Sequence, residues 1–306
     1  MPPLRECGYA HARYAEALAE FGHPRKLDRS GAWILERSIP GSQFKDGMGC
    51  YPIFCCRDWT ALVKDMEELS DLVSLAIVTD PFGEYDISLL RECFPDLAIP
   101  FKHHYVTDLT RKPETFVSEH HRRNIRKSLA RVEVEHCEDP ERYASTWVEL
   151  YQHLIQKHSI TGMSAFSPVS LTEQLHVPGL EAFRAIFEGN TVGIVLWLVQ
   201  NDVVYYHLGA YDNIGYQTRS SYAVFSTALD SFARRGLRWL SLGSAAGLTE
   251  DEANGLARFK RGWSTGTRTA YLCGRILNPA AYQQLVSDAH TGGSGYFPLY
   301  RMREFG

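Results

Sequence analysis

Apolar positions recur along the chain with two different spacings, which together predict alternating strands and helices. Leu72–Val78 is almost continuously apolar, as in a buried strand, and Asp80-Pro81 ends it. From Trp147 to Ile155 apolar residues return every three or four positions, which predicts an amphipathic helix. Three short apolar segments between Phe183 and Tyr211 are separated by turn residues, so they predict an antiparallel meander.

The order of these elements predicts two consecutive domains. Tyr51–Cys56 and His103–Val106 look extended, and a long basic helix is expected from about Pro113 to Arg131. The pattern then starts again near Val132 as strand, helix, meander, helix, strand, helix, strand. We therefore expect an α/β (α+β) fold of mixed sheets flanked by helices, with domains at residues 1–130 and 131–275.

The most distinctive segment is Phe259-Lys260-Arg261-Gly262-Trp263. It follows an amphipathic helix predicted at Ser221–Gly236 and a strand predicted at Leu237–Ser244, and it ends a second short helix. A cation held beside an aromatic ring at a helix end suits the binding of a developing negative charge. The alternative is a surface lysine whose stem lies along an amphipathic helix.

Composition narrows the class of protein. The chain has 306 residues, of which 44% are hydrophobic, and a net charge of −4. These values fit a packed globular protein and argue against a general nucleic-acid coat, although a local basic patch is still possible. The seven cysteines include no C-x-x-C pair, and no apolar run has membrane-spanning length. We expect reduced thiols and a cytoplasmic protein with no signal peptide.

Several phrases together resemble the FemAB family, whose members have the acetyltransferase-type (GNAT) fold. They are Tyr211-Asp212, Ser220–Val224, Leu242-Gly243, Phe259–Trp263 and the basic stretch Arg123–Arg131. The resemblance covers about residues 100–280. It implies two tandem GNAT-like domains, with the C-terminal tail 276–306 returning to the first.

The same resemblance implies an aminoacyltransferase that forms an amide bond. The donor would be an aminoacyl-tRNA, and the acceptor an amine of a cell-wall precursor or small metabolite, with no cofactor and no metal. Lys260 would neutralise the anionic intermediate, a kind of contact whose removal typically costs about 3 kcal/mol. Phe259 would lie beside the substrate.

The segment Asn213–Ser221, which we expect to be a loop, bears on the identity of the donor. Acetyltransferases that use coenzyme A usually hold its pyrophosphate with Arg/Gln-x-x-Gly-x-Gly/Ala at a helix N-terminus. Here Tyr222 and Val224 occupy the two glycine positions, and their side chains would obstruct phosphate. This departure from the glycine pattern argues against acyl-CoA as the donor. FemAB-like proteins share it. Arg219 and Ser221 are candidate substrate-binding residues, although Ser221 could simply cap the helix.

A basic cluster is a candidate contact for tRNA phosphates. It comprises Arg122, Arg123, Arg126 and Lys127. The alternative is a solvated helix face.

His207 is a candidate general base on the third meander strand. Strict alternation would place it on one face with Tyr205, Gly209 and Tyr211, and the two tyrosines are candidate substrate contacts. Asp212 could orient the amine or the base. A hydrogen-bonded core histidine and a turn-initiating aspartate are the alternatives.

Other activities stay open. An acyl-CoA-dependent N-acyltransferase on the same fold is one alternative, and a non-catalytic RNA- or nucleotide-binding module is another. The histidine pairs His103-His104 and His120-His121 lack the spacing of a zinc site. The sequence also has no phosphate-binding loop motif and no nucleophile-elbow motif. The sequence leaves the amino acid, the acceptor and the oligomeric state open.

Overall fold

The computed structural model of this chain describes residues 6–245, 255–288 and 296–305. The chain divides into two compact units. One consists of Met1–Gly8 and Lys102–Arg268, and the other of Tyr9–Phe101 and Thr269–Gly306. This division differs from the expected boundary at residues 130/131. The basic helix falls within the unit that holds the meander because it packs against the meander's following helix.

Strands of the first unit form a mixed sheet with a long antiparallel meander. In spatial order they are β5 (Leu97–Asp108), β10 (Trp239–Ser241), β9 (Val203–Tyr211), β8 (Asn190–Gln200), β7 (Leu180–Phe187) and β6 (Glu133–Cys137). The pairing of β10 with β9 is parallel, and the other pairings are antiparallel. The predicted meander and the mixed α/β fold class are confirmed.

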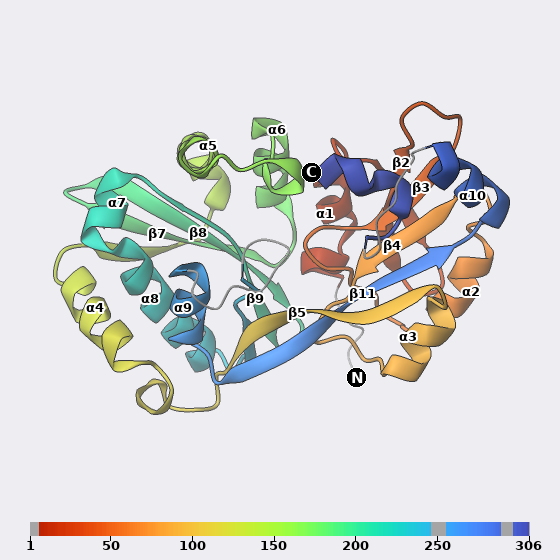
Figure 1. The fold of residues 1–306 in the computed structure, drawn as a ribbon. Helices are drawn as coiled ribbons and strands as arrows, with labels where there is room; N and C mark the ends of the chain where they lie inside the picture. Colours follow the sequence, from red (N-terminus) through yellow and green to blue (C-terminus); the bar gives the residue numbers. More distant parts are fainter. Residues whose placement is uncertain (1–5, 246–254, 289–295, 306) are drawn as a thin grey trace. The chain divides into compact units, whose positions relative to one another are not determined.

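Helices cover both faces of this sheet (Figure 1). On one side lie α5 (Ala144–His158) and α6 (Pro168–Glu173); on the other lie α4 (Glu119–Leu129), α8 (Ser220–Arg234) and α9 (Gly255–Arg261). The α8 side holds a core in which Trp197 contacts Phe225 and Phe232 edge to face. Burying such large rings supplies much of the driving force for docking the helix on the sheet.

A β-bulge in β9 alters which side chains share a face. Leu196 of β8 pairs with Leu208, but the next residue, Trp197, pairs with Tyr206, so His207 is an extra residue. The strict alternation expected for this strand is therefore wrong beyond His207. Gly209 lies on the Tyr206 side, because a Cβ placed on it would come within 2.8 Å of the Tyr206 hydroxyl.

The second unit is also built on parallel and antiparallel strands. Its strands are β1 (His23–Leu27), β2 (Ala32–Ser38), β3 (Lys45–Gly49), β4 (Ser74–Val78) and β11 (Gly266–Ile276), with β3 and β4 parallel. Its helices include α1 (Ala12–Ala17), α2 (Leu62–Glu67), α3 (Ile87–Cys93) and α10 (Pro279–Asp288). Residues 272–276 of β11 belong to this unit and pair antiparallel with β4.

The C-terminal segment is anchored within the second unit. The 3-10 helix Leu299–Phe305 places Arg301 against Asp46 of β3, and both side chains are buried. Arg301 also donates to the carbonyl of Ser38, and the Tyr300 hydroxyl donates to Asp46 at 3.1 Å. A buried carboxylate with several donors is well satisfied, so this cluster fixes the tail to the sheet.

Local differences from the sequence predictions have identifiable causes. The basic helix α4 begins at Glu119, and not near Pro113, because the Ser118 hydroxyl accepts from the His121 amide and caps it. Residues 51–56 form no strand; Phe54 alone makes a bridge, to Thr79. Within the described residues, no helix is both long enough and apolar enough to cross a membrane.

Candidate active site

Lys260 is a buried cation anchored by a main-chain oxygen. It lies near the end of α9, and its side chain is only 7% exposed. Its Nζ donates to the carbonyl oxygen of Ser244 at 2.6 Å and lies 5.7 Å from the centroid of the Tyr206 ring. Gly243, at φ +73°, passes so close that a Cβ there would be 3.3 Å from Nζ. The lysine is therefore not a surface residue.

The electrostatic setting of Lys260 favours contact with an anion. Burial lowers its pKa from 10.5 to about 7, because water no longer solvates the ammonium. Over the part of the chain that the structure describes, no carboxylate forms an ion pair with it. A negative charge formed beside Nζ would stabilise the ammonium and be stabilised in turn.

Helix α4 holds the end of α9 through His121. The His121 Nε2 lies 2.9 Å from the carbonyl oxygen of Phe259, and its Nδ1 lies 2.8 Å from the Ser118 hydroxyl. Burial lowers the pKa of His121 below its usual 6.5, so the neutral ring is favoured at physiological pH. This residue was missed from sequence, where it was considered only as a zinc ligand.

Gly262 makes the approach of His121 possible. A Cβ at Gly262 would lie 2.1 Å from the His121 ring, which no side chain could tolerate without movement. The Gly262 carbonyl also accepts from the Ser118 amide at 3.0 Å. The glycine of the distinctive Phe259–Trp263 segment therefore serves close packing of two helices.

His207 lies on the opposite face of the sheet from Lys260. Its Nε2 lies 2.7 Å from the Oε1 of Gln174, which follows α6, whereas Lys260 lies over Tyr206 on the α8 side. Burial lowers the pKa of His207 to about 3. Because the neighbouring residues Tyr206 and His207 face opposite sides of the strand, the expected partnership of His207 with Lys260 in one site is not found.

The neighbours predicted for His207 divide between the two faces. Tyr205 is buried on the His207 side, one residue before Tyr206. Tyr211 belongs to the α8-side core, and its buried hydroxyl has no hydrogen-bond partner among the described residues. Asp212 caps α7 (Asn213–Thr218) by accepting from the Gly215 amide at 2.6 Å. The capping role is observed, whereas contact with substrate stays a prediction.

Residues 117–261 match the family model described as an acetyltransferase (GNAT) domain. This part of the chain has the GNAT fold. No curated protein matches the sequence significantly.

Solved structures share the fold of the whole chain. FemX is 15% identical with a TM-score of 0.65, and the match covers 89% of this chain and 93% of FemX. The C-terminal domain (DUF2156) of a proposed lysylphosphatidylglycerol synthetase from Agrobacterium fabrum is 14% identical, with a TM-score of 0.64 and coverages of 96% and 95%. L-PGS from Bacillus licheniformis is 14% identical, with a TM-score of 0.54 and coverages of 87% and 92%. At these identities the shared property is the fold.

The GNAT domain has no open loop before α8. The residues predicted as a loop form α7, and Arg219 alone, at φ +58°, separates α7 from α8. Arg219 donates to the Asn124 side chain of α4. Ser221 is half-buried in the first turn of α8, and the adjacent Ser220 hydroxyl lies 2.8 Å from that of Thr218. Helix and side chains thus fill the approach to this N-terminus.

The two bulky residues that replace glycines are part of the packing. Val224 is fully buried, and the Tyr222 ring lies 5.0 Å from that of His121 and 5.2 Å from that of Phe259. Phe259 is in turn 4.9 Å from Phe225. Phe259 therefore contributes mainly to the core that supports Lys260, and a contact with substrate stays a prediction.

The basic cluster of α4 is exposed, which agrees both with contact to tRNA phosphates and with a solvated helix face. Arg122, Arg123, Arg126 and Lys127 face solvent, whereas His121, Asn124 and Ser128 face α8. Arg122 also donates to the carbonyls of Glu114 and Val117, both at 3.0 Å. The remaining cations could contact phosphate without desolvation of a buried charge.

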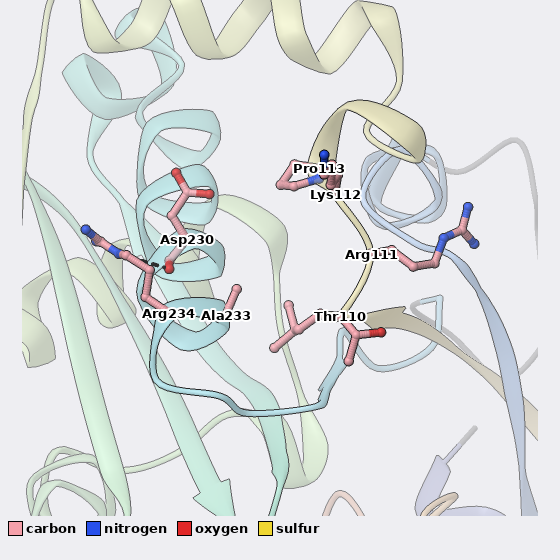
Figure 2. Close-up of a pocket in the computed structure, with 8 residues that line it drawn as sticks. Thr110, Arg111, Lys112, Pro113, Asp230, Ala233 and Arg234 are labelled. Atoms are coloured by element: carbon pink, nitrogen blue, oxygen red, sulfur yellow. Dashed lines mark hydrogen bonds between the residues drawn. The ribbon is translucent and has the colours of Figure 1, made fainter.

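Figure 2 shows a hollow whose lining does not include Lys260. It is bounded by Thr110–Pro113 after β5 and by Asp230, Ala233 and Arg234 of α8. Asp230 and Arg111 point in different directions, and Arg234 donates to the Asp230 carbonyl at 3.3 Å. Because its charged groups diverge, the hollow offers no convergent anion site.

Proposed function

We propose that this protein is an aminoacyl-tRNA-dependent transferase that forms an amide bond on an amine of a small metabolite or cell-wall precursor. The observation that carries the proposal is the buried ammonium of Lys260, held by the Ser244 carbonyl with no carboxylate partner among the residues that the structure describes. A fixed donor of this kind suits an acyl transfer, in which a carbonyl oxygen becomes negatively charged.

In the proposed reaction the acceptor amine attacks the carbonyl carbon of the aminoacyl ester. The new C–N bond forms as the carbonyl oxygen becomes an oxyanion, and Nζ of Lys260 donates a hydrogen bond to that oxygen. The ester C–O bond then breaks, and the ribose oxygen leaves with the proton that the amine loses. His207 does not take this proton in the proposed reaction. Its side chain bonds to Gln174 on one face of the sheet, whereas Lys260 lies on the other face.

Two observations support tRNA as the donor and not acyl-CoA. The α7–α8 junction places helix and bulky side chains where a coenzyme A pyrophosphate loop would need glycines. The exposed cations of α4 offer a phosphate-binding surface. Arg219 is linked to the same helix, because it donates a hydrogen bond to the side chain of Asn124.

The test is hydrolysis or transfer of the aminoacyl group from charged tRNA. Purified protein is incubated with a mixture of tRNAs carrying radiolabelled amino acids, and loss of label from tRNA is followed with and without candidate amines. Phosphatidylglycerol, which offers a hydroxyl and would give an ester, is added as a non-amine comparison, since one similar structure is named for lysylphosphatidylglycerol synthesis. We expect one class of charged tRNA to be deacylated, ribonuclease to abolish the activity, and Lys260→Met to lower it at least a hundred-fold.

The same assay separates the alternatives. Ribonuclease-resistant transfer from radiolabelled acetyl-CoA would favour an acyl-CoA-dependent N-acyltransferase. RNA binding without turnover, unaffected by Lys260→Met, would favour a binding module. Either result would overturn the proposal.

A further inference from the structure

The carbonyl of Phe259 lacks its usual helical partner. In a continued α-helix this carbonyl would accept a hydrogen bond from the amide of Trp263. That amide donates instead to the main-chain carbonyl oxygen of Lys260, at 3.1 Å. The last carbonyls of a helix need other donors when they are buried. His121 supplies one here, with Nε2 at 2.9 Å.

The His121 ring is itself held in one orientation. Because Nε2 must donate to a carbonyl, Nδ1 is the acceptor and receives the Ser118 hydroxyl proton. Rings of Tyr222, Phe259 and Trp263 lie within 5.5 Å of it, centroid to centroid, and Gly262 leaves the space it occupies. The imidazole therefore connects the start of α4 rigidly to the end of α9.

We infer that His121 is a positioning residue for Lys260. Its Nε2–H fixes the peptide that joins Phe259 to Lys260, and that peptide sets the direction in which the lysine side chain leaves α9. This inference rests on the proposed function only for its catalytic consequence. Fixing the peptide is a local effect that can be measured without substrate.

The experiment compares three variants of the full-length protein. His121→Phe keeps an aromatic ring but removes the donor, so the Phe259 carbonyl is left unsatisfied. His121→Gln restores an N–H near the position of Nε2. His120→Phe is the matched control, because His120 is exposed and its hydrogen bond is to the Asn124 side chain and not to α9. The His120 ring also meets the rings of His121 and Tyr222 edge to face, and phenylalanine keeps an aromatic ring there.

Two readouts are needed. We expect His121→Phe to lower kcat by about ten- to a hundred-fold with little change in KM, because a small displacement of a catalytic group has that effect. His121→Gln should recover most of kcat. Selective 15N labelling of lysine side chains reports the pKa of Nζ directly, with the Lys260 resonance identified by its loss in Lys260→Met. In His121→Phe this pKa should move away from about 7, and His121→Gln should return it.

Failure of this inference is distinguishable from failure of the proposed function. A folded His121→Phe protein whose Lys260 resonance titrates as in the wild type would overturn the positioning role, whatever the activity. If the Lys260 resonance shifts but no charged tRNA is deacylated, the positioning role stands and the proposed reaction fails. Thermal unfolding of each variant confirms that the folded state is being compared.

Discussion

Charge on Lys260 is the residue-scale variable that controls the proposed reaction. Burial holds its pKa near 7, so the fraction of ammonium falls as the pH rises through that value. The acceptor amine attacks only in its neutral form, and the fraction of neutral amine increases as the pH rises. We therefore expect kcat/KM to rise and then to fall above about pH 7.

Lys260→Arg tests this assignment of the alkaline limb. Arginine stays charged throughout this range, so the fall above pH 7 should disappear even if the maximal rate is lower. The measurement is kcat/KM from pH 5.5 to 9.5 for both proteins. A wild-type rate that keeps climbing to pH 9 would contradict the assignment of the alkaline limb to deprotonation of Lys260.

Gly262→Ala should disrupt the site without touching a charged group. The new Cβ would collide with the His121 ring, so α4 and α9 must move apart. We expect destabilisation of about 1–3 kcal/mol, as for other overpacked sites, together with a large loss of activity. Chemical denaturation and the deacylation assay measure the two effects.

Gly266→Ala is the control for that substitution. Nothing lies within 4 Å of the position its Cβ would occupy. If the two glycine substitutions changed stability and activity equally, the loss in Gly262→Ala would not come from the contact between Gly262 and His121.

Sequence could indicate Lys260 because its whole motif is local. The aromatic, cationic and small residues lie within five positions, and the amphipathic helix before them is also continuous. His121 and Ser244 could not be found that way. His121 donates to the main-chain oxygen of Phe259, and Ser244 offers its own main-chain oxygen to Lys260. A main-chain oxygen has no signature in the sequence.

At the scale of single elements, periodicity succeeds where strands and helices are regular. It located the meander closely and α5 and α8 within a few residues, because each buries one apolar face. It failed at the β9 bulge, where one extra residue reverses the faces without changing the composition. It also failed at α7, whose start is set by a single side-chain cap.

Asp212→Ala should weaken α7 in a way that separates capping from catalysis. Loss of the hydrogen bond to the Gly215 amide typically costs about 1 kcal/mol. Asp212→Asn keeps a good cap and should restore stability in thermal unfolding. If Asp212→Asn regains stability but not activity, the carboxylate also has the substrate-orienting role expected from the sequence.

At the scale of the whole molecule, sequence order predicted two α/β parts but not their limits. The limits depend on which strands pair: β5 joins β10, while residues 272–276 of β11 join β4. Such long-range pairings are not encoded in local spacing.

Removing Arg301 should destabilise the second unit. Asp46 is fully buried, so Arg301→Met would leave its carboxylate with fewer donors and cost about 3–5 kcal/mol. Arg29→Met is the comparison, because its ion pair with Glu68 is exposed to solvent and should contribute little to stability. Urea unfolding of both variants measures the difference, and similar midpoints would contradict the anchoring role of Arg301.

The partner of the Lys260 ammonium is a peptide oxygen, and this has a practical consequence for comparing relatives. Any residue at position 244 supplies the same acceptor, so substitutions there can accumulate without loss of the lysine's anchor. A mutational scan of Ser244 should consequently look silent. Replacing the amide that follows it with an ester, by chemical ligation, would weaken that oxygen as an acceptor and expose the dependence.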